Sequence, residues 1–191
     1  LGVCLLSSVF AQPPNDNFAL PQAHRKEIGI PYFRNYTPKE YGGDAQNWSI
    51  AQDARGVMYF GNSSGVLEYD GVAWRLIHVT GAGAVRALAQ GNDGTIYVGA
   101  DGEMGYLAPD AFGRMQYVSL REHVPGEHRD VATIVKVYAT TAGIYFQTFD
   151  RLFLWSNGRM RVWKPERPFH IAFAVRDQLY IRQPGTGLLR F

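Results

Sequence analysis

Residues 56–74 read "GVMYFGNSSGVLEYDGVAW". Short apolar and aromatic runs alternate here with glycines and other turn-forming residues. Runs of this length that are rich in Val, Tyr, Phe and Trp predict β-strands. Asp70-Gly71 tolerates the positive φ angles that a tight hairpin requires. The segment therefore predicts consecutive antiparallel strands, and it contains no catalytic motif.

The same pattern recurs along the chain. Residues 47–77 align with 84–118, and "GVMYFG" (56–61) matches "GTIYVG" (94–99). A third copy spans 131–163 and a fourth begins at 169–191. One tyrosine marks the register of each copy at intervals of about 40 residues: Tyr59, Tyr97, Tyr145 and Tyr180. Because a repeated position usually serves the repeat, these tyrosines are expected to pack between repeats.

Four strands in a unit of about 40–45 residues are typical of a β-propeller blade. The sequence therefore predicts an all-β fold, a β-propeller of four-stranded antiparallel blades. Blades are expected at 47–79, 84–120 and 131–163, with the start of a fourth at 169–191. Trp74 and Trp163 fall on matching outer strands, where a structural role is expected. About three and a half blades are too few for a closed ring, so we expect this partial propeller (31–191) to be a fragment of a longer chain.

The first residues predict export. Residues 1–11 are uncharged and end in Val9-Phe10-Ala11, which fits the small-residue rule for signal-peptidase cleavage. Two alternatives are a lipid-attachment motif at Cys4 and a first buried strand. Residues 12–30 are polar and contain prolines, as expected of a linker. Because Cys4 is the single cysteine, an internal disulfide and a cysteine zinc site are excluded.

Residues 31–36, "PYFRNY", match the outer-strand position that residues 74–79 occupy in the first blade. This segment precedes the first inner strand. We therefore expect it to be a closing outer strand that pairs with the last blade of the ring and leaves no free edge.

Several motifs in residues 29–77 resemble the N-terminal sensor region of bacterial two-component regulator propeller proteins. They are "FRNY" (33–36), "IAQD" (50–53), "GVMYFG" (56–61) and "GVLEYDG" (65–71), and "VGADGEMGYLAPD" (98–110) resembles the second blade of that family. The resemblance is strong in the first two blades and weaker in the third. It implies an exported ligand-sensing propeller, linked through a membrane helix to a cytoplasmic output such as a histidine kinase or nucleotide cyclase.

Composition and motifs exclude other roles. The net charge is +2 without a basic cluster, so no nucleic-acid partner is expected. His123 and His128 do not form a strong metal-ligand pair, and no phosphate-binding loop is present. We expect no metal, no cofactor and no enzymatic activity in this segment. Two alternatives to a sensor remain: a secreted binding or scaffold propeller without signalling output, and a propeller lyase or hydrolase whose scattered acids converge.

A ligand is expected on the face where the inner strands begin, because the longer connectors lie there. These are 42–47, 62–64, 81–84, 100–103 and 148–151. The candidate ligand-binding residues are Asn47, Trp48, Asn62, Arg86, Asp101 and Glu103. The expected partner is a small molecule or, by analogy, a carbohydrate. Membrane association and homodimerisation are expected only through parts outside this sequence.

Overall fold

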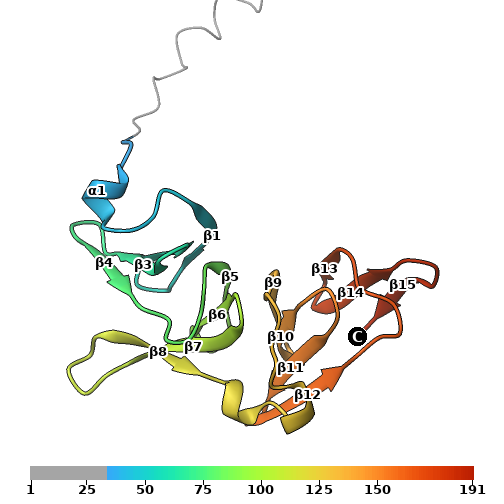
Figure 1. Ribbon diagram of the computed structural model, residues 1–191. Helices are drawn as coiled ribbons and strands as arrows, with labels where there is room; N and C mark the ends of the chain where they lie inside the picture. Colours follow the sequence, from blue (N-terminus) through green and yellow to red (C-terminus); the bar gives the residue numbers. More distant parts are fainter. Residues whose placement is uncertain (1–33) are drawn as a thin grey trace, which may run out of the picture. The chain divides into compact units, whose positions relative to one another are not determined.

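The computed structural model describes residues 34–191 (Figure 1). The predicted signal-peptide remnant (1–11), the linker (12–30) and residues 31–33 lie outside the described residues. Within Tyr36–Phe191, strands dominate, and the helical elements are α1 (Pro38–Tyr41) and the 3-10 turns η2 (Arg121–His123) and η3 (Gly126–His128). The predicted all-β class is confirmed.

The strands form four antiparallel sheets, each in simple sequence order. Blade 1 contains β1 (Asn47–Gln52), β2 (Met58–Asn62), β3 (Gly65–Tyr69) and β4 (Trp74–Ile77). Blade 2 contains β5 (Val85–Gln90), β6 (Ile96–Ala100), β7 (Glu103–Pro109) and β8 (Met115–Ser119). Blade 3 contains β9 (Lys136–Thr140), β10 (Gly143–Gln147), β11 (Leu152–Ser156) and β12 (Arg159–Trp163). Blade 4 contains β13 (Ala172–Val175), β14 (Gln178–Gln183) and β15 (Gly187–Arg190).

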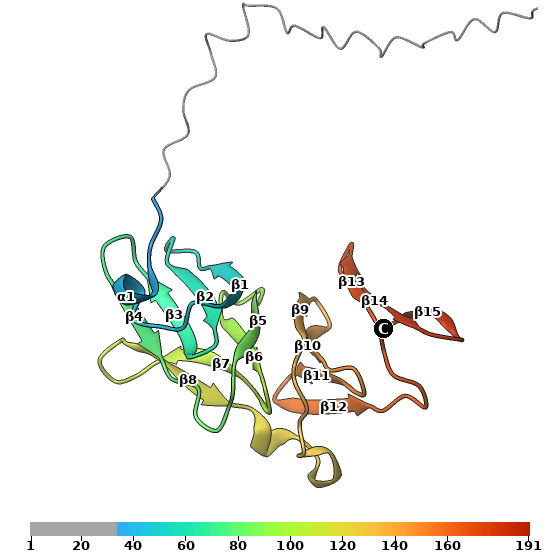
Figure 2. The same ribbon diagram turned by 45° about the horizontal axis from the view of Figure 1, so that its top comes forward.

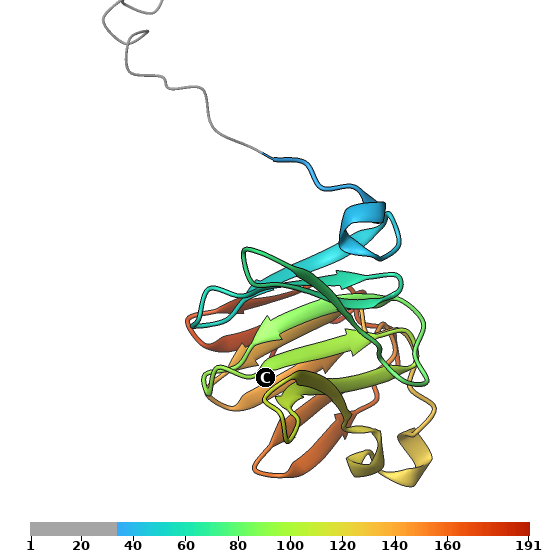
Figure 3. The same ribbon diagram turned by 90° about the vertical axis from the view of Figure 1, so that its left-hand side faces the viewer.

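The four blades follow one another along an open arc and do not close into a ring (Figure 1). Figure 3, seen from the side of blades 1 and 2, shows their strands in front of those of blades 3 and 4. Successive sheets thus lie face to face, as the repeat predicts. Blade 3 differs from its expected span in one respect: residues 131–135 are not a strand, and β9 begins at Lys136.

The start of each inner strand lies beside the turn between the second and third strands. Asn47 pairs with Asn62, Val85 with Ala100, and Lys136 with Gln147. We call this side of the blades the inner-start face. It carries the starts of β1, β5, β9 and β13 and the turns 63–64, 101–102 and 148–151.

The hairpins of the opposite face have the predicted turn chemistry. One carboxylate in each of several turns accepts hydrogen bonds from backbone N–H groups: Asp53, Asp70, Asp93 and Asp110. Asn157 and Gly158 form a two-residue turn at positive φ, 51° and 72°. Hairpins saturated in this way leave few polar groups for a ligand, whereas the inner-start face also carries the longer connectors between blades, 78–84, 120–135 and 164–171.

The hydrophobic core lies between blades, and the repeated tyrosines belong to it. Tyr59 is fully buried in a cluster with Val85, Ile96 and other side chains of blade 2. Tyr97 packs in the same way with residues of blade 3, and Tyr145 with residues of blade 4. Tyr180 is half-buried. The expected packing of these tyrosines between blades is therefore confirmed for the first three positions.

A glycine two residues after the tyrosine allows the next blade to approach closely. A Cβ added at Gly61 would lie 2.9 Å from the carbonyl oxygen of Val85, and one at Gly99 would lie 2.4 Å from Ile134 Cγ2. Side chains cannot approach to these distances. In blade 3 the corresponding residue is Gln147, which is buried and donates a hydrogen bond to the carbonyl oxygen of His170 at 2.6 Å. In Figure 2, β13 accordingly stands further from β9 than β5 does from β1.

Tyr36 contacts the outside of blade 1. Residues 34–36 are not in a strand. The ring centroid of Tyr36 lies 5.2 Å from that of Trp74 in an edge contact, and its hydroxyl shares a hydrogen bond with that of Tyr69. Pairing of residues 31–36 with a last blade stays a prediction.

Glycine at the close-approach position is expected to be required for stability. Gly99→Ala places a methyl group against Ile134 and Val137, so the free energy of unfolding should fall by about 2–3 kcal/mol. Gly126→Ala is the matched control, because no atom lies within 4 Å of a Cβ added there. Urea unfolding of both variants measures the difference. Equal stability of the two variants would contradict this explanation of blade spacing.

Candidate functional site

Trp48, Arg86 and Asp101 form a cluster on the inner-start face. The guanidinium carbon of Arg86 lies 4.1 Å from the ring centroid of Trp48, within cation–π range. Arg86 Nε and Nη2 donate to the two carboxylate oxygens of Asp101 at 2.9 and 3.1 Å. Trp48 Nε1 donates to Ser63 Oγ at 3.2 Å. Residues from blades 1 and 2 thus build one ordered group, brought together by β1, β5 and two turns.

This cluster is accessible to solvent and remains charged at neutral pH. Trp48 is 39% exposed, and the side chains of Arg86 and Asp101 are 31% and 29% exposed. Hydrogen bonds from Arg86 lower the pKa of Asp101, while partial burial acts in the opposite direction. The same hydrogen bonds raise the pKa of Arg86. An aromatic ring, a donor group and an acceptor group are therefore presented side by side, as recognition of a polar ligand requires.

Asn62 does not reach the surface. It is fully buried, and its amide nitrogen donates to the carbonyl oxygens of Asp44 and Gln46 and to Asn47 Oδ1. Its amide oxygen accepts hydrogen bonds from the backbone N–H groups of Asp44 and Ser64. Asn62 therefore holds the connector before β1 in shape. The exposed Asn47 contributes its side-chain oxygen to the same network.

Glu103 is also buried, at 4% exposure. Its Oε1 accepts hydrogen bonds from the Met104 backbone and from Ser119 Oγ at 2.9 Å each. The structure thus brings Trp48, Arg86 and Asp101 together and keeps Asn62 and Glu103 inside blades 1 and 2. Sequence alone does not separate these cases, because a polar residue at a strand end can serve either a turn or a ligand.

Phe149 was missed by the sequence analysis. It lies in the turn 148–151, which is longer than the corresponding turns 63–64 and 101–102, and it is 58% exposed. The buried Thr148 holds this turn, since its hydroxyl accepts from the backbone of Asp150 and Arg151 and donates to Asp150 Oδ1. An aromatic residue between Thr and Asp in a lengthened turn was the available signal.

Two hollows meet at Phe149. One, of about 490 Å³, is lined by Arg86, Ala132, Thr133, Val135, Phe149 and Asp150. The other, of about 700 Å³, lies between blades 3 and 4 and is lined by Val135, Lys136, Tyr138, Gln147, Phe149, His170, Ile171, Ala172, Phe173 and Ala174. Because Val135 and Phe149 line both, the two hollows are neighbours on the inner-start face.

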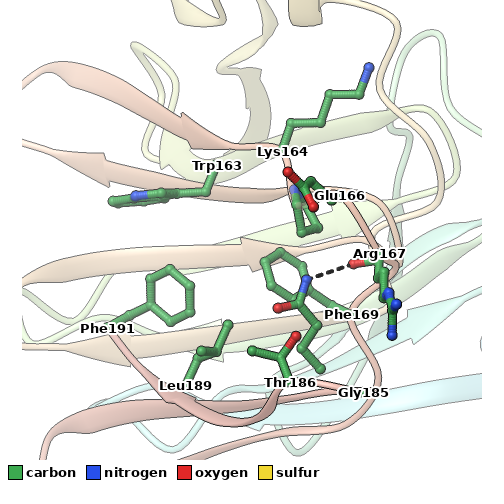
Figure 4. Close-up of a pocket in the computed structure, with 11 residues that line it drawn as sticks. Trp163, Lys164, Glu166, Arg167, Phe169, Gly185, Thr186, Leu189 and Phe191 are labelled. Atoms are coloured by element: carbon green, nitrogen blue, oxygen red, sulfur yellow. Dashed lines mark hydrogen bonds between the residues drawn. The ribbon is translucent and has the colours of Figure 1, made fainter.

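A third hollow, of about 570 Å³, lies at the outer side of blades 3 and 4 (Figure 4). Trp163, Phe169 and Phe191 line it with Leu189, and Gln183 Nε2 bonds to the carbonyl oxygen of Arg167 across it. It adjoins the outer edge of β15, where the other three blades have a fourth strand. We therefore attribute this hollow to the three-stranded sheet of blade 4 and do not interpret it as a ligand site.

Residues 34–191 contain no group of three or more His, Cys, Asp or Glu side chains arranged to hold a metal ion. The helices in this described range are all too short and polar for a membrane crossing.

The Arg86–Asp101 pair predicts a specific titration. The pKa of Asp101 should lie below its ordinary value of 3.8 and should rise in Arg86→Gln, because that variant loses both hydrogen bonds. Carbon-detected NMR of the carboxyl group measures it, with Arg55→Gln as the control that leaves Asp101 unchanged.

The lowered pKa of Asp101 also makes the stability of the fold depend on pH. Because the pKa of Asp101 is lower in the folded than in the unfolded protein, its ionised carboxylate stabilises the fold. This contribution is fully present above pH 3.8 and is lost as the pH falls through the lower folded value. A pKa of Asp101 that is the same in the wild type and in Arg86→Gln would contradict the pairing.

Comparison with known proteins gives structural neighbours. No protein-family model matches the sequence, and no curated protein matches it. Two solved structures, named as extracellular domains of hybrid two-component systems of Bacteroides thetaiotaomicron, are both 15% identical. They match 76% and 71% of this chain with TM-scores of 0.55 and 0.50. Virginiamycin B lyase from Staphylococcus aureus, 14% identical, matches 76% of the chain with a TM-score of 0.51.

These similarities establish the fold. The chain spans 20% of each of the two extracellular-domain chains and 55% of the lyase chain. At such identities the likeness concerns the fold alone, and one fold commonly supports several functions. The chain has the β-propeller fold found in extracellular domains of Bacteroides two-component systems, the kind of sensor region that its sequence motifs resemble.

Proposed function

We propose that this chain is the extracytoplasmic ligand-sensing propeller of a bacterial membrane signalling protein. Two independent observations support the proposal: the sequence motifs resemble such sensor regions, and the structural neighbours include extracellular domains of two-component systems. In this proposal the ligand binds to the inner-start face. The signal then passes to a cytoplasmic output module through parts of the protein outside this sequence.

The observation that carries the proposal is the geometry of Trp48, Arg86 and Asp101. Trp48 presents an exposed indole held in place by Ser63 and Arg86. Such a ring packs against the C–H groups of a sugar, while the neighbouring guanidinium and carboxylate bond to hydroxyl groups. A carbohydrate is therefore the ligand class that we favour for this cluster. Residues from separate blades form it, so a bound ligand would act on the contact between blades.

The acidic residues support binding rather than catalysis. Five of the acids scattered over blades 1 and 2 each have a hydrogen-bond partner in their own blade: Glu68, Asp70, Asp101, Glu103 and Asp110. A general acid or base must instead reach the substrate. The lyases among the structural neighbours share the fold with this chain, and that likeness carries no assignment of activity.

The binding site can be tested with single substitutions. Trp48→Ala and Asp101→Asn should each weaken binding of an oligosaccharide identified from a panel by about tenfold or more, because each removes a central contact. Isothermal titration calorimetry measures the affinity, and thermal unfolding confirms that the variants are folded. Glu103 is unsuitable for this test because it is buried.

Val72→Ala is the matched control, since Val72 is 89% exposed in a hairpin of the opposite face. If Trp48→Ala and Asp101→Asn bound the ligand normally and Val72→Ala lost binding, the ligand would lie on the face opposite the inner-start face. That result would contradict the proposal. Signalling itself is tested by the complete reading frame: a stop directly after the propeller would support a secreted scaffold instead.

A further inference from the structure

The hollow between blades 3 and 4 arises from a departure from the repeat. Glycine occupies the close-approach position in blades 1 and 2, and Gln147 occupies it in blade 3. The Gln147 side chain reaches the carbonyl oxygen of His170 and fills the space that would otherwise admit the next inner strand. The hollow of about 700 Å³ opens beside it. Blade packing therefore does not explain this space, because the repeat would close it.

The lining of the hollow is apolar with a positively charged rim. Phe149 is 58% exposed, which is high for a large apolar side chain. Ile171 and Phe173 also line the hollow and are 49% and 48% exposed; they flank the buried Ala172, so their side chains lie on the face of the sheet turned away from the core that blade 4 shares with blade 3. Lys136 and His170 lie at its rim, both exposed, and Arg182 Nη1 approaches His170 Nδ1 at 3.4 Å. None of the ten lining residues is acidic. A bound group should therefore have an apolar body and a negative charge.

The aromatic walls are held in position before any ligand binds. Thr148 fixes the turn that carries Phe149, and the carbonyl oxygen of Phe149 accepts a hydrogen bond from the Phe169 backbone at 2.7 Å. On the other side, Tyr138 donates its hydroxyl hydrogen bond to the carbonyl oxygen of Ala172 at 2.9 Å. Walls that are already ordered reduce the entropy lost on binding.

We propose that this hollow binds a small organic anion with a flat apolar body, of the aromatic carboxylate class. Its ring lies against Phe149, Ile171 and Phe173, and its carboxylate faces Lys136 and His170. The volume is in the range of about 300–1,000 Å³ typical of small-molecule sites. This site is separate from the Trp48 cluster and does not depend on it, although both lie on the inner-start face.

The probe is 2-naphthoate, titrated into the isotopically labelled full chain and followed by NMR. We expect saturable shifts of the backbone signals of residues 136–138, 149 and 171–174, with a Kd of about 0.1–1 mM for a ligand of this size. The neutral analogue 2-naphthalenemethanol should bind about fivefold more weakly, because it lacks the charge that Lys136 attracts.

Substitutions separate the two parts of the site. Phe149→Ala and Phe173→Ala should each weaken 2-naphthoate binding by roughly five- to tenfold through loss of an aromatic contact. Phe112→Ala is the matched control, since Phe112 is 90% exposed in a turn of the opposite face. Lys136→Gln should remove most of the preference for the carboxylate over the alcohol while retaining binding of the alcohol.

Absence of saturable shifts up to about 5 mM probe, well above the expected Kd, would overturn the proposal. Equal affinity in Phe149→Ala, Phe173→Ala and Phe112→Ala would also overturn it, because binding would then lie elsewhere. Trp48→Ala should leave the affinity for 2-naphthoate unchanged. A failure of the carbohydrate proposal is therefore distinguishable from a failure of this one.

Discussion

The fold depends on how closely one blade can approach the next. A blade is a small sheet that cannot bury its apolar face alone, so its stability comes from the neighbouring sheet. Gly61 and Gly99 allow the chain of the following blade to come within contact distance of the second strand. Tyr59 and Tyr97, two residues earlier, then fill the space between sheets as part of a continuous core. In these two repeats the glycine thus sets the distance between neighbouring sheets, and the tyrosine fills the space between them.

The same constraint explains where sites arise. Where the spacing rule holds, the blades are close and only the ends of their strands are open, which leaves Trp48, Arg86 and Asp101 as a surface cluster. Where Gln147 replaces the glycine, the blades separate and an apolar hollow appears beside Phe149. Both features lie on the inner-start face, whereas the polar groups of the opposite hairpins are saturated by their own aspartates. A rigid scaffold with binding groups on one set of connectors is a common arrangement.

The repeat predicted the fold because its signals are local: apolar runs, turn residues and a recurring tyrosine each specify structure within a few residues. The cluster was predicted in part. Trp48, Arg86 and Asp101 lie together on the inner-start face, whereas Asn62 and Glu103 turn inward to satisfy backbone groups. A polar residue at a strand end has the same sequence signal in both roles. The hollow was not predicted, because it depends on a contact between Gln147 and His170 that belong to different blades.

The residue at the close-approach position sets the spacing between blades. A crystal structure of Gln147→Gly, which restores the residue of blades 1 and 2, tests it most directly. In this variant β13 should move toward β9, and the hollow lined by Phe149 and Phe173 should largely disappear. An unchanged separation of the two strands, with the hollow intact, would contradict it.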